Sequence, residues 1–409
     1  MKKLLLFMDN QIYGGSEKLM YSIINNHTIN EEYNIKVMYG KNKYMSNGIK
    51  NDYGNMQKSF YAPHIITNSF YYHISISNTN KYIKNIIRLP FWLLNKLFIT
   101  AIYNFITLFL YVIFIKPDCI HINNGGHPGS LNCRIMIIIA SLLNIKFIYQ
   151  VNNQACKVNG FEDKIIDNIL NNKAQQIIVA SKLAKEKLIQ NRSLKSEKIS
   201  IIPNTIREEI ISKSRNELLS EFNIPNSKYI ITEVAFLEER KGQKYLIKAI
   251  KQIRDKYPDI FKNLHLILVG SGVNEHALHK LIIKYELCNN VTLTGYRTDS
   301  INFINASDLF ILPSIGNEDM PLVILSAMKL GKNIISTNFA GIKEEIINDV
   351  SGKLIEPDIN TLSDNIQKNI VDCIYSHKNW GKEARNRFYS FFSPEIYTQS
   401  ILNLYKKSF

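Results

Sequence analysis

Short apolar runs rich in Ile, Val and Leu alternate along the chain with longer segments in which apolar residues recur at helical spacing. This alternation is typical of a parallel β-sheet that is covered by helices on both faces. The pattern therefore predicts an α/β protein. The clearest strand candidates in the first half are 3–8, 119–122, 146–150, 176–179 and 199–202, and those in the second half are 229–234, 264–269, 290–293, 309–312 and 333–335.

Each series of strands is large enough for an open sheet of its own, so the pattern predicts two domains. The break falls in the sequence IIPNT, residues 201–205, where a proline interrupts the strand pattern, and a polar helical stretch follows over 207–221. After Pro357 the chain turns helical and ends in a segment rich in Tyr and Phe. Residues 41–80, with many Asn, Ser and Tyr and weak periodicity, are expected to form a loop or insertion.

The composition is that of a folded protein. With 409 residues, 45% hydrophobic and 21% charged, the chain is neither disordered nor fibrous. Lysine and arginine exceed the acids and leave a formal charge of +15. A basic surface favours an anionic partner, such as lipid headgroups, nucleic acid or a phosphorylated substrate. The basic residues are dispersed and no RNA or DNA motif is visible, so we expect no nucleic-acid partner.

The cysteines and the first residues indicate a reducing compartment, which we expect to be the cytoplasm. The cysteines lie far apart without a C-x-x-C pair, which argues against a disulfide framework and against a zinc cluster. The start, MKKLLLFMDN, is interrupted by Asp9 and is too short for a signal-peptide core, so we expect a buried first strand. The cysteines are Cys119, Cys133, Cys156, Cys288 and Cys373.

One apolar segment could instead indicate a membrane protein. Residues 97–115, LFITAIYNFITLFLYVIFI, carry no charge and lie between Lys96 and Lys116. By length and apolarity the segment qualifies as a membrane span. The alternatives are a helix buried under its own sheet, or a helix that lies on the bilayer with its aromatic side down. A span would separate strands of one sheet across the membrane, so we favour the alternatives, including a peripheral position at the inner face of the plasma membrane.

Ligands of open parallel sheets bind beyond the carboxyl ends of the strands, so glycines that follow strands are candidate site residues. Gly14 and Gly15 follow the first strand and open a helix, where a phosphate could approach the backbone amides. A glycine turn with a Ser cap is also ordinary architecture. In HINNGGH, residues 121–127, two histidines and two glycines follow another strand, and a helix-capping turn is the alternative to a ligand site.

The second half has a comparable set of candidates. Arg240 and Lys241 stand beside a glycine in the sequence EERKG, and two cations in such a loop suit a diphosphate. A solvated charge cluster fits equally well. Gly270 lies in LVGSG, which is half of a nucleotide fingerprint and more often a packing turn. His276 and His279 share a helical face without a third ligand in reach, so we expect no metal site.

The segment 290–352 reads NVTLTGYRTDSINFINASDLFILPSIGNEDMPLVILSAMKLGKNIISTNFAGIKEEIINDVSG. It resembles the donor-binding core of family 4 glycosyltransferases, and the turns GGSE, HINNGG, PNT, EERKG and LVGSG stand in family order over nearly the whole chain. The resemblance implies an α/β GT-B fold, in which two Rossmann-like, doubly wound parallel-sheet domains face each other across a cleft. The implied domains are an acceptor-binding domain, 1–203, and a nucleotide-sugar-binding domain, 204–385, with a C-terminal helix at about 386–409 that packs back on the first.

The resemblance also implies roles for single residues. Lys241 matches the family lysine that neutralises the nucleotide diphosphate, and Glu318 matches the first glutamate of the Glu-x7-Glu motif, which holds donor-sugar hydroxyls. His121 lies where family members carry a catalytic or sugar-contacting histidine; the second histidine position of that motif is Asn123, and His127 is a rival for the role. The further expected contacts are Gly14, Gly15, Arg240, Gly270, Arg297, Met320, Leu322 and Ser326 on the donor side, and Asn123, Gly125, Gly126 and His127 on the acceptor side.

Two positions depart from the family pattern. The second glutamate of Glu-x7-Glu, which usually binds the ribose, is replaced by Ser326. A hydroxyl cannot make a charge-assisted hydrogen bond, so about 1–2 kcal/mol of nucleotide affinity is at stake. The family arginine of the V-G-R-L strand end is replaced by Phe236, and Arg240 is the nearby cation that could supply its charge.

The resemblance implies an enzyme that transfers a sugar from a nucleotide-sugar, which we expect to be UDP-linked, to a hydroxyl of a saccharide or lipid-linked saccharide in surface polysaccharide synthesis. It implies retention of the anomeric configuration and no metal or cofactor besides the nucleotide-sugar substrate. The apolar segment 97–115, with Arg88, Lys96 and Lys116 around it, suits work at an anionic membrane. The alternatives are a catalytically impaired relative that binds sugar nucleotides, and an epimerase of the same fold.

Overall fold

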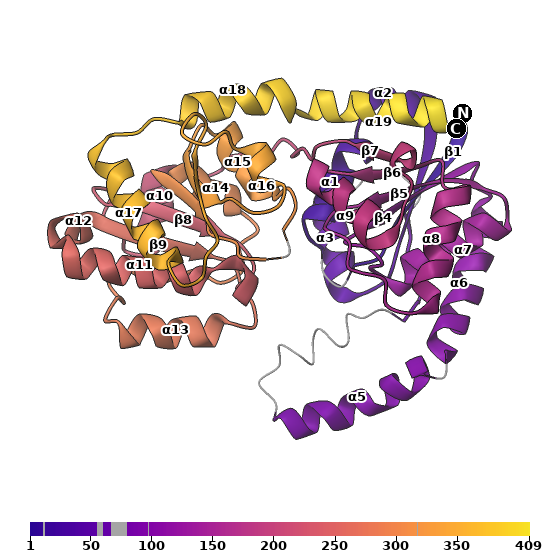
Figure 1. The fold of residues 1–409 in the computed structure, drawn as a ribbon, viewed down its shortest axis with the longest axis horizontal. Coiled ribbons are helices and arrows are strands. Elements are labelled where there is room, and N and C mark those ends of the chain that lie inside the picture. The colour runs from indigo at the N-terminus through magenta and orange to yellow at the C-terminus, as the bar shows by residue number, and fades with distance from the viewer. Residues whose placement is uncertain (11–12, 55–59, 67–79, 97, 317) are drawn as a thin grey trace. The chain divides into compact units, whose positions relative to one another are not determined.

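The computed structural model describes residues 1–10, 13–54, 60–66, 80–96, 98–316 and 318–409. By internal contact the chain divides into two compact units (Figure 1). The first unit consists of Met1–Arg207 together with Pro394–Phe409, and the second is Glu208–Ser393. The division therefore lies a few residues after the proposed boundary at 203/204, and the chain returns to the first unit at Pro394.

The first unit contains one sheet of parallel strands in the order β3-β2-β1-β4-β5-β6-β7. Strand β1 lies between β2 and β4, so the chain reverses its direction of travel through the sheet at β1. In doubly wound sheets such a reversal marks the edge at which ligands bind. The strands are β1 (Lys2–Met8), β2 (Tyr33–Tyr39), β3 (Phe60–Tyr61), β4 (Cys119–Asn124), β5 (Lys146–Val151), β6 (Gln176–Val179) and β7 (Ile199–Ile201).

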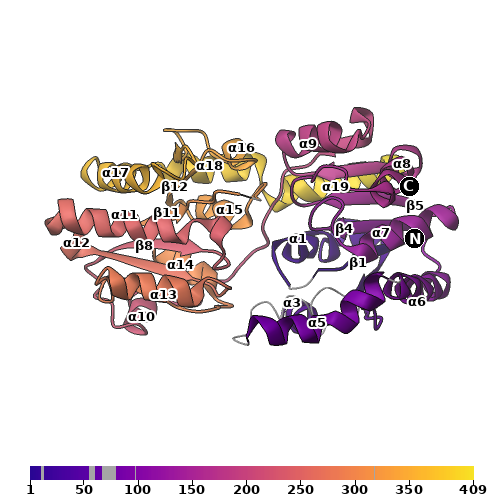
Figure 2. The same cartoon turned by 60° about the horizontal axis from the view of Figure 1, so that its bottom comes forward.

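Helices cover both faces of this sheet (Figure 2). Alternate residues of β1 face opposite sides: Leu5 and Phe7 join one apolar core, whereas Leu4, Leu6 and Met8 join the other. This is why β1 is a nearly continuous apolar run. The first core is covered by α6 (Ile99–Ile115), α7 (Leu131–Leu142), α8 (Phe161–Lys173) and α9 (Lys182–Arg192), and the second by α1 (Gly15–Ile24), α2 (His27–Glu32), α3 (Lys43–Tyr53) and α19 (Pro394–Ser408).

The second unit repeats this architecture with a parallel sheet in the order β10-β9-β8-β11-β12-β13. The two parallel-sheet units confirm the predicted fold class. The strands are β8 (Tyr229–Val234), β9 (Leu264–Val269), β10 (Val291–Leu293), β11 (Leu309–Leu312), β12 (Asn333–Thr337) and β13 (Lys353–Ile355). The helices are α10 (Arg215–Ser220), α11 (Gln243–Lys256), α12 (Pro258–Asn263), α13 (Glu275–Lys284), α14 (Ser300–Ala306), α15 (Leu322–Lys329), α16 (Ile342–Glu345), α17 (Leu362–Tyr375) and α18 (Gly381–Phe391).

Several expected elements differ from the structure. The expected loop at 41–80 contains α3 and β3, although 55–59 and 67–79 lie outside the described residues. Only α10 is helical within the stretch 207–221, and the final helix is divided: α18 packs against α15 of the second unit, whereas α19 packs against α1 of the first. The hydrophobic pattern did not predict strand β2, because Asn34 and Lys36 interrupt its apolar residues.

The apolar segment 97–115 forms α6 for most of its length, and strands from before and after it belong to the same sheet. One edge of α6 is buried against α7. Across the residues that the structure describes, none of the helices combines the length and the apolarity that a membrane crossing requires. The helix α5 (Lys81–Lys96) precedes α6 and extends away from the sheet of its own unit (Figures 1 and 2).

Candidate functional site

In the second unit, two neighbouring strands, β8 and β11, end in loops that are held tightly together. Gly242, at the end of the EERKG loop, has a φ of +81°, and a Cβ added there would lie 2.1 Å from the carbonyl oxygen of Pro313. Only glycine tolerates that conformation and that approach. The Ile315 amide also donates a hydrogen bond of 2.8 Å to the carbonyl oxygen of Arg240. The two loops therefore form one rigid platform at the carboxyl edge of the sheet.

This platform brings three of the predicted site residues into direct contact. Lys241 Nζ donates to Oε1 of Glu318, and Arg240 Nη1 donates to the same oxygen at 2.8 Å. Arg240 Nε also pairs with Glu238 Oε2 at 2.8 Å. The side chains of Lys241 and Glu318 are 9% and 8% exposed, whereas that of Arg240 is 29% exposed. Two cations and two carboxylates thus form a compact cluster that still reaches solvent through Arg240.

Two buried carboxyl groups near this cluster were missed by the sequence analysis. Burial raises the pKa of Glu233 well above its usual range, although the charge of Lys241 and a hydrogen bond from Gln243 oppose the rise. Glu345 is completely buried, and neither of its carboxylate oxygens has a hydrogen-bond partner among the described residues. Burial raises the pKa of Glu345 well above its usual range, and the nearby charges of Asp319 and Glu318 add to the rise.

The remaining donor-side candidates of the second unit are engaged with the protein itself. Ser326 is buried, and its hydroxyl donates to the carbonyl of Leu322 within α15 at 3.2 Å. A Cβ on Gly270 would lie 2.0 Å from the carbonyl oxygen of Ala235, so close packing alone requires this glycine. Arg297 pairs with Asp299 at 2.8 Å and with Glu221 at 3.1 Å. Met320 is buried in the loop before Leu322, the first residue of α15.

In the first unit, a glutamate at the start of α1, which was not predicted as a site residue, binds the turn between β1 and α1. Glu17 is buried, and its Oε2 accepts a hydrogen bond of 3.0 Å from the Gly14 amide. Asn10 and Ser16 donate to the same carboxylate. The Gly14 amide therefore binds the Glu17 carboxylate, and a phosphate contact of this turn stays a prediction. Gly15 is the exposed first residue of α1.

His121 lies inside the first unit and not at a ligand-facing edge. Its side chain is completely buried in the middle of β4, and burial lowers the pKa of His121 to about 4, although a hydrogen bond to Gln150 opposes this. The Nδ1 atom is 2.6 Å from the Tyr405 hydroxyl, and Nε2 is 3.0 Å from Gln150 Oε1. Both ring nitrogens are therefore hydrogen-bonded within the protein, and the catalytic role of His121 stays a prediction.

Two neutral amide side chains, Asn123 and Asn152, also lie at the carboxyl edge of this sheet. Asn123, at the end of β4, is buried, donates to the carbonyl of Ser16 at 3.2 Å and accepts from Asn152 Nδ2 at 2.7 Å. Gly125 follows directly, and a Cβ there would lie 3.2 Å from Asn10 Oδ1. Gly126 is the next residue of the same bend. These side chains join the ends of β1, β4 and β5, and Asn152 was not foreseen.

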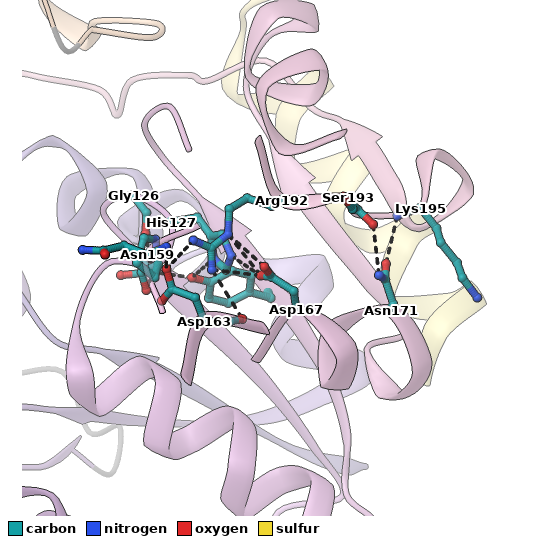
Figure 3. Close-up of polar contacts among 12 residues, drawn as sticks. Gly126, His127, Asn159, Asp163, Asp167, Asn171, Arg192, Ser193 and Lys195 are labelled. Carbon is teal, nitrogen blue, oxygen red and sulfur yellow. Dashed lines mark hydrogen bonds and ion pairs between the residues drawn. The ribbon is translucent and has the colours of Figure 1, made fainter. Parts of the chain in front are cut away.

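His127 belongs to a buried ion network (Figure 3). Its Nε2 is 2.8 Å from Asp167 Oδ1, and its Nδ1 is 3.1 Å from the Tyr149 hydroxyl. Arg192 pairs with Asp163 at 2.6 Å and with Asp167 at 3.0 Å. Burial lowers the pKa of His127, while Asp167 opposes this effect. The network connects the loop after β4 with α8 and α9, so His127 has a structural role as well as a place among the acceptor-side candidates.

The described part of the chain contains no group of three or more His, Cys, Asp or Glu residues that is arranged to hold a metal ion.

Comparison with known proteins finds a family match in the second unit of the chain. Residues 214–387, which lie within the second unit, match the family model described as glycosyl transferases group 1. An uncharacterized glycosyltransferase of Methanocaldococcus jannaschii is 30% identical over 233 residues, which cover 54% of this chain and 56% of that protein. A UDP-Gal:α-D-GlcNAc-diphosphoundecaprenol α-1,3-galactosyltransferase of Escherichia coli is 31% identical over 179 residues, 42% of this chain and 45% of the relative. The chain thus spans about half the length of these relatives.

The similarity to solved structures, in contrast, covers nearly the whole chain. The Anabaena protein HepE, solved in complex with UDP-glucose, superimposes with a TM-score of 0.73 over 99% of this chain and 100% of its own, at 18% identity. This likeness shows that the two units have the α/β architecture of GT-B glycosyltransferases, and that the sheets of both units belong to it.

Proposed function

We propose that the protein is a glycosyltransferase that moves a sugar from a nucleotide-sugar to a hydroxyl of a saccharide or lipid-linked saccharide. The observation that carries the proposal is the convergence of Lys241, Arg240 and Glu318 on one platform, inside the stretch that matches the group 1 family. We further propose a UDP-linked donor, because the names of both the Escherichia coli relative and the HepE complex include UDP-sugars. The same relative's name includes a diphosphoundecaprenol acceptor, which supports a lipid-linked acceptor and surface polysaccharide synthesis.

The demanding step is the departure of a nucleoside diphosphate from the anomeric carbon, so the site must stabilise negative charge on the leaving group. Lys241 and Arg240 are the cations that would do so, and a bound diphosphate would compete with Glu318 for them. Glu318 would then hold hydroxyl groups of the donor sugar. These roles need no metal ion, and they fit retention of configuration if the leaving phosphate accepts the proton of the acceptor hydroxyl.

The first unit would receive the acceptor at the carboxyl edge of its sheet. His121 has no part in this proposal because both of its nitrogens are bound within the core. Asn152, which is partly exposed, and the exposed Gly15 at the start of α1 are the groups that we place at this edge, and the buried Asn123 supports Asn152 through its side-chain oxygen. Neutral amides suit the hydroxyl groups of a saccharide, since an amide both donates and accepts hydrogen bonds.

The experiment that tests the donor proposal is a thermal-shift panel of UDP, GDP, ADP and dTDP and their sugars with the full chain. A ligand that binds only the folded state raises the melting temperature, so the donor is the nucleotide-sugar with the largest shift. Lys241→Ala should abolish that shift, and Lys244→Ala is the matched control because Lys244 pairs with Glu239 on the outer side of the same loop. Equal shifts in wild type and Lys241→Ala would overturn the proposed site.

Ser326 and Phe236 favour one further candidate, a catalytically impaired relative that binds the sugar nucleotide without transferring it. An epimerase of the same fold is distinguished by the same assay. Transfer requires an acceptor, an epimerase converts the donor without one, and an impaired relative leaves the donor unchanged in both conditions. Loss of donor only in the presence of a saccharide acceptor supports the transferase.

A further inference from the structure

The helix α6 has an apolar face that the protein does not cover. It contains 17 residues, none of them charged, and it buries only one edge, where Asn104 donates a hydrogen bond of 2.8 Å to Asn132 of α7. The other side faces solvent, with exposed fractions from 44% for Ile113 to 75% for Phe114. Soluble surfaces rarely carry such a continuous apolar area without a partner. The exposed stripe consists of Ile99, Ile102, Tyr103, Ile106, Leu110, Ile113 and Phe114.

The stripe follows helical spacing along the whole of α6, which at 1.5 Å per residue is about 26 Å long. The neighbouring helix α5, which contacts α6, also exposes Ile87, Leu89 and Trp92. Tryptophan is enriched where protein meets the headgroup layer of a membrane, because its ring is apolar and its nitrogen donates a hydrogen bond. Two helices in contact therefore both expose apolar side chains.

The charges around this surface have one sign. Residues 81–117 contain five cations and no acid, although acids are frequent in the rest of the chain. The cations precede and follow the apolar stripe, which is the arrangement of segments that lie on anionic membranes. Two copies of this chain that met through the surface would bring two cation-rich segments together without an acid to balance them. The cations are Lys81, Lys84, Arg88, Lys96 and Lys116.

The surface also lies close to the edge of the sheet where ligands are expected. Asn104, in the second turn of α6, contacts Asn132, and Asn132 Nδ2 donates to Asp9 Oδ2 at 2.9 Å. Asp9 directly follows β1, so the first turns of α6 are at the carboxyl edge of the sheet. A lipid-bound molecule on this surface would be held next to that edge.

We infer that α5 and α6 form a membrane-docking surface for an anionic bilayer. The exposed stripe of α6 and the apolar residues of α5 enter the boundary between headgroups and acyl chains, about 5–10 Å deep, and the described cations Lys84, Arg88 and Lys116 contact the acidic headgroups. The helices lie in the plane of the membrane and do not cross it. The inference does not depend on the identity of the sugar, the nucleotide or the reaction.

Vesicle flotation of the full chain tests this surface, with vesicles of phosphatidylcholine alone and of phosphatidylcholine mixed with phosphatidylglycerol. We expect the protein to float with the mixed vesicles, and to float less at high salt. The double variant Ile106→Asp/Leu110→Asp should lower the bound fraction by roughly tenfold or more, and Lys84→Glu/Arg88→Glu should remove the dependence on acidic lipid.

Matched controls come from the exposed side of α13, where Ile283→Asp and Lys280→Glu/Lys284→Glu should leave flotation unchanged. Circular dichroism and the thermal shift with the donor nucleotide check that each variant is folded. Flotation that is absent with both lipids, or equal in the α6 and α13 variants, overturns the inference. It is also overturned if sedimentation shows a dimer that Ile106→Asp/Leu110→Asp dissociates, because the stripe is then an interface between two copies.

Discussion

The charged residues of the platform in the second unit and the histidines of the first unit were both predicted as site residues from the family resemblance. In the structure they differ in burial and in their contacts. Lys241, Arg240 and Glu318 lie in loops after strands and contact one another close to solvent. His121 lies within a strand, and His127 lies in a loop that is buried beneath helices. Position in a loop after a strand is therefore not sufficient to keep a polar side chain exposed, because His127 is buried and hydrogen-bonded at both nitrogens while Arg240 remains partly exposed.

The two regions differ in the partners that their polar side chains have and in how exposed those side chains are to solvent. In the platform cluster, Arg240 is 29% exposed and each cation pairs with a carboxylate, so a bound diphosphate could replace the carboxylate as the anionic partner. The His121 and His127 side chains are fully buried and hydrogen-bonded at both nitrogens. Removing a partner from such a group leaves a buried polar atom unsatisfied. Mutations in the first region should therefore change activity, and mutations in the second should change stability.

The largest expected effect is on stability, in the network around His127. Arg192→Met should lower the free energy of unfolding by about 3–5 kcal/mol, because Asp163 and Asp167 would remain as buried carboxylates without their cation. Urea denaturation followed by circular dichroism measures the loss. Arg254→Met is the control, since Arg254 pairs with Asp255 in a half-exposed position where an ion pair contributes little. Similar losses in both variants would contradict the network's role.

In the platform, the main expected effect is on activity. Lys241→Ala should reduce the turnover of the nucleotide-sugar by about 100- to 1000-fold, because a charge that stabilises the leaving diphosphate is lost. The melting temperature should also fall, because Lys241 is buried and pairs with Glu318, so the turnover is compared per folded protein. Initial rates at saturating acceptor provide the measurement, with Lys244→Ala as the control. Turnover that falls only in proportion to folded protein would assign Lys241 a structural role.

A pH-dependent effect is expected from Glu345, which is buried behind the platform. Its pKa is raised above the usual 4.5, so the fold favours the neutral form and loses stability as the pH rises from 4.5 toward the raised pKa. The loss is about 1.4 kcal/mol for each pH unit in that range. Glu345→Gln should therefore raise the melting temperature at neutral pH and change it little near pH 4.5.

Melting curves at several pH values test this expectation. The neighbouring Glu344→Gln is the control, because the structure does not bury Glu344 completely. A gain in Glu345→Gln that does not depend on pH would mean that Glu345 loses its proton over the same pH range in the folded and the unfolded protein, so its pKa would not be raised by folding.

The smallest effect is expected for the hydrogen bond that joins α19 to His121. Tyr405→Phe removes the hydroxyl that lies 2.6 Å from His121 Nδ1 and should cost about 1 kcal/mol of unfolding free energy. The specific activity of the folded protein should not change, which separates a structural His121 from a catalytic one. Tyr389→Phe, at an exposed tyrosine, is the control. A large loss of turnover without a loss of stability would restore the catalytic interpretation.

Much of the fold was predictable because buried parallel strands are continuous apolar runs. The runs at 176–179, 229–234, 264–269 and 309–312 agree with β6, β8, β9 and β11 residue for residue. Strands β2, β3 and β13 were not predicted; polar residues interrupt the apolar residues of β2, and β3 has only two residues. Of the candidate site, the platform could be predicted from its loops, whereas Glu233 and Glu345 could not, because no local pattern marks an acid that becomes buried.

The amino-acid sequence alone determined the order of strands and helices, the two parallel sheets and the loops that carry Lys241 and Glu318, since these follow from local hydrophobic pattern and from short segments. Only the tertiary structure decided which polar groups are open to a ligand. The Tyr405 hydroxyl and Gln150 reach His121 from distant parts of the chain, and Glu17 occupies the Gly14 amide. Burial and pairing depend on neighbours in space, which spacing along a chain does not encode.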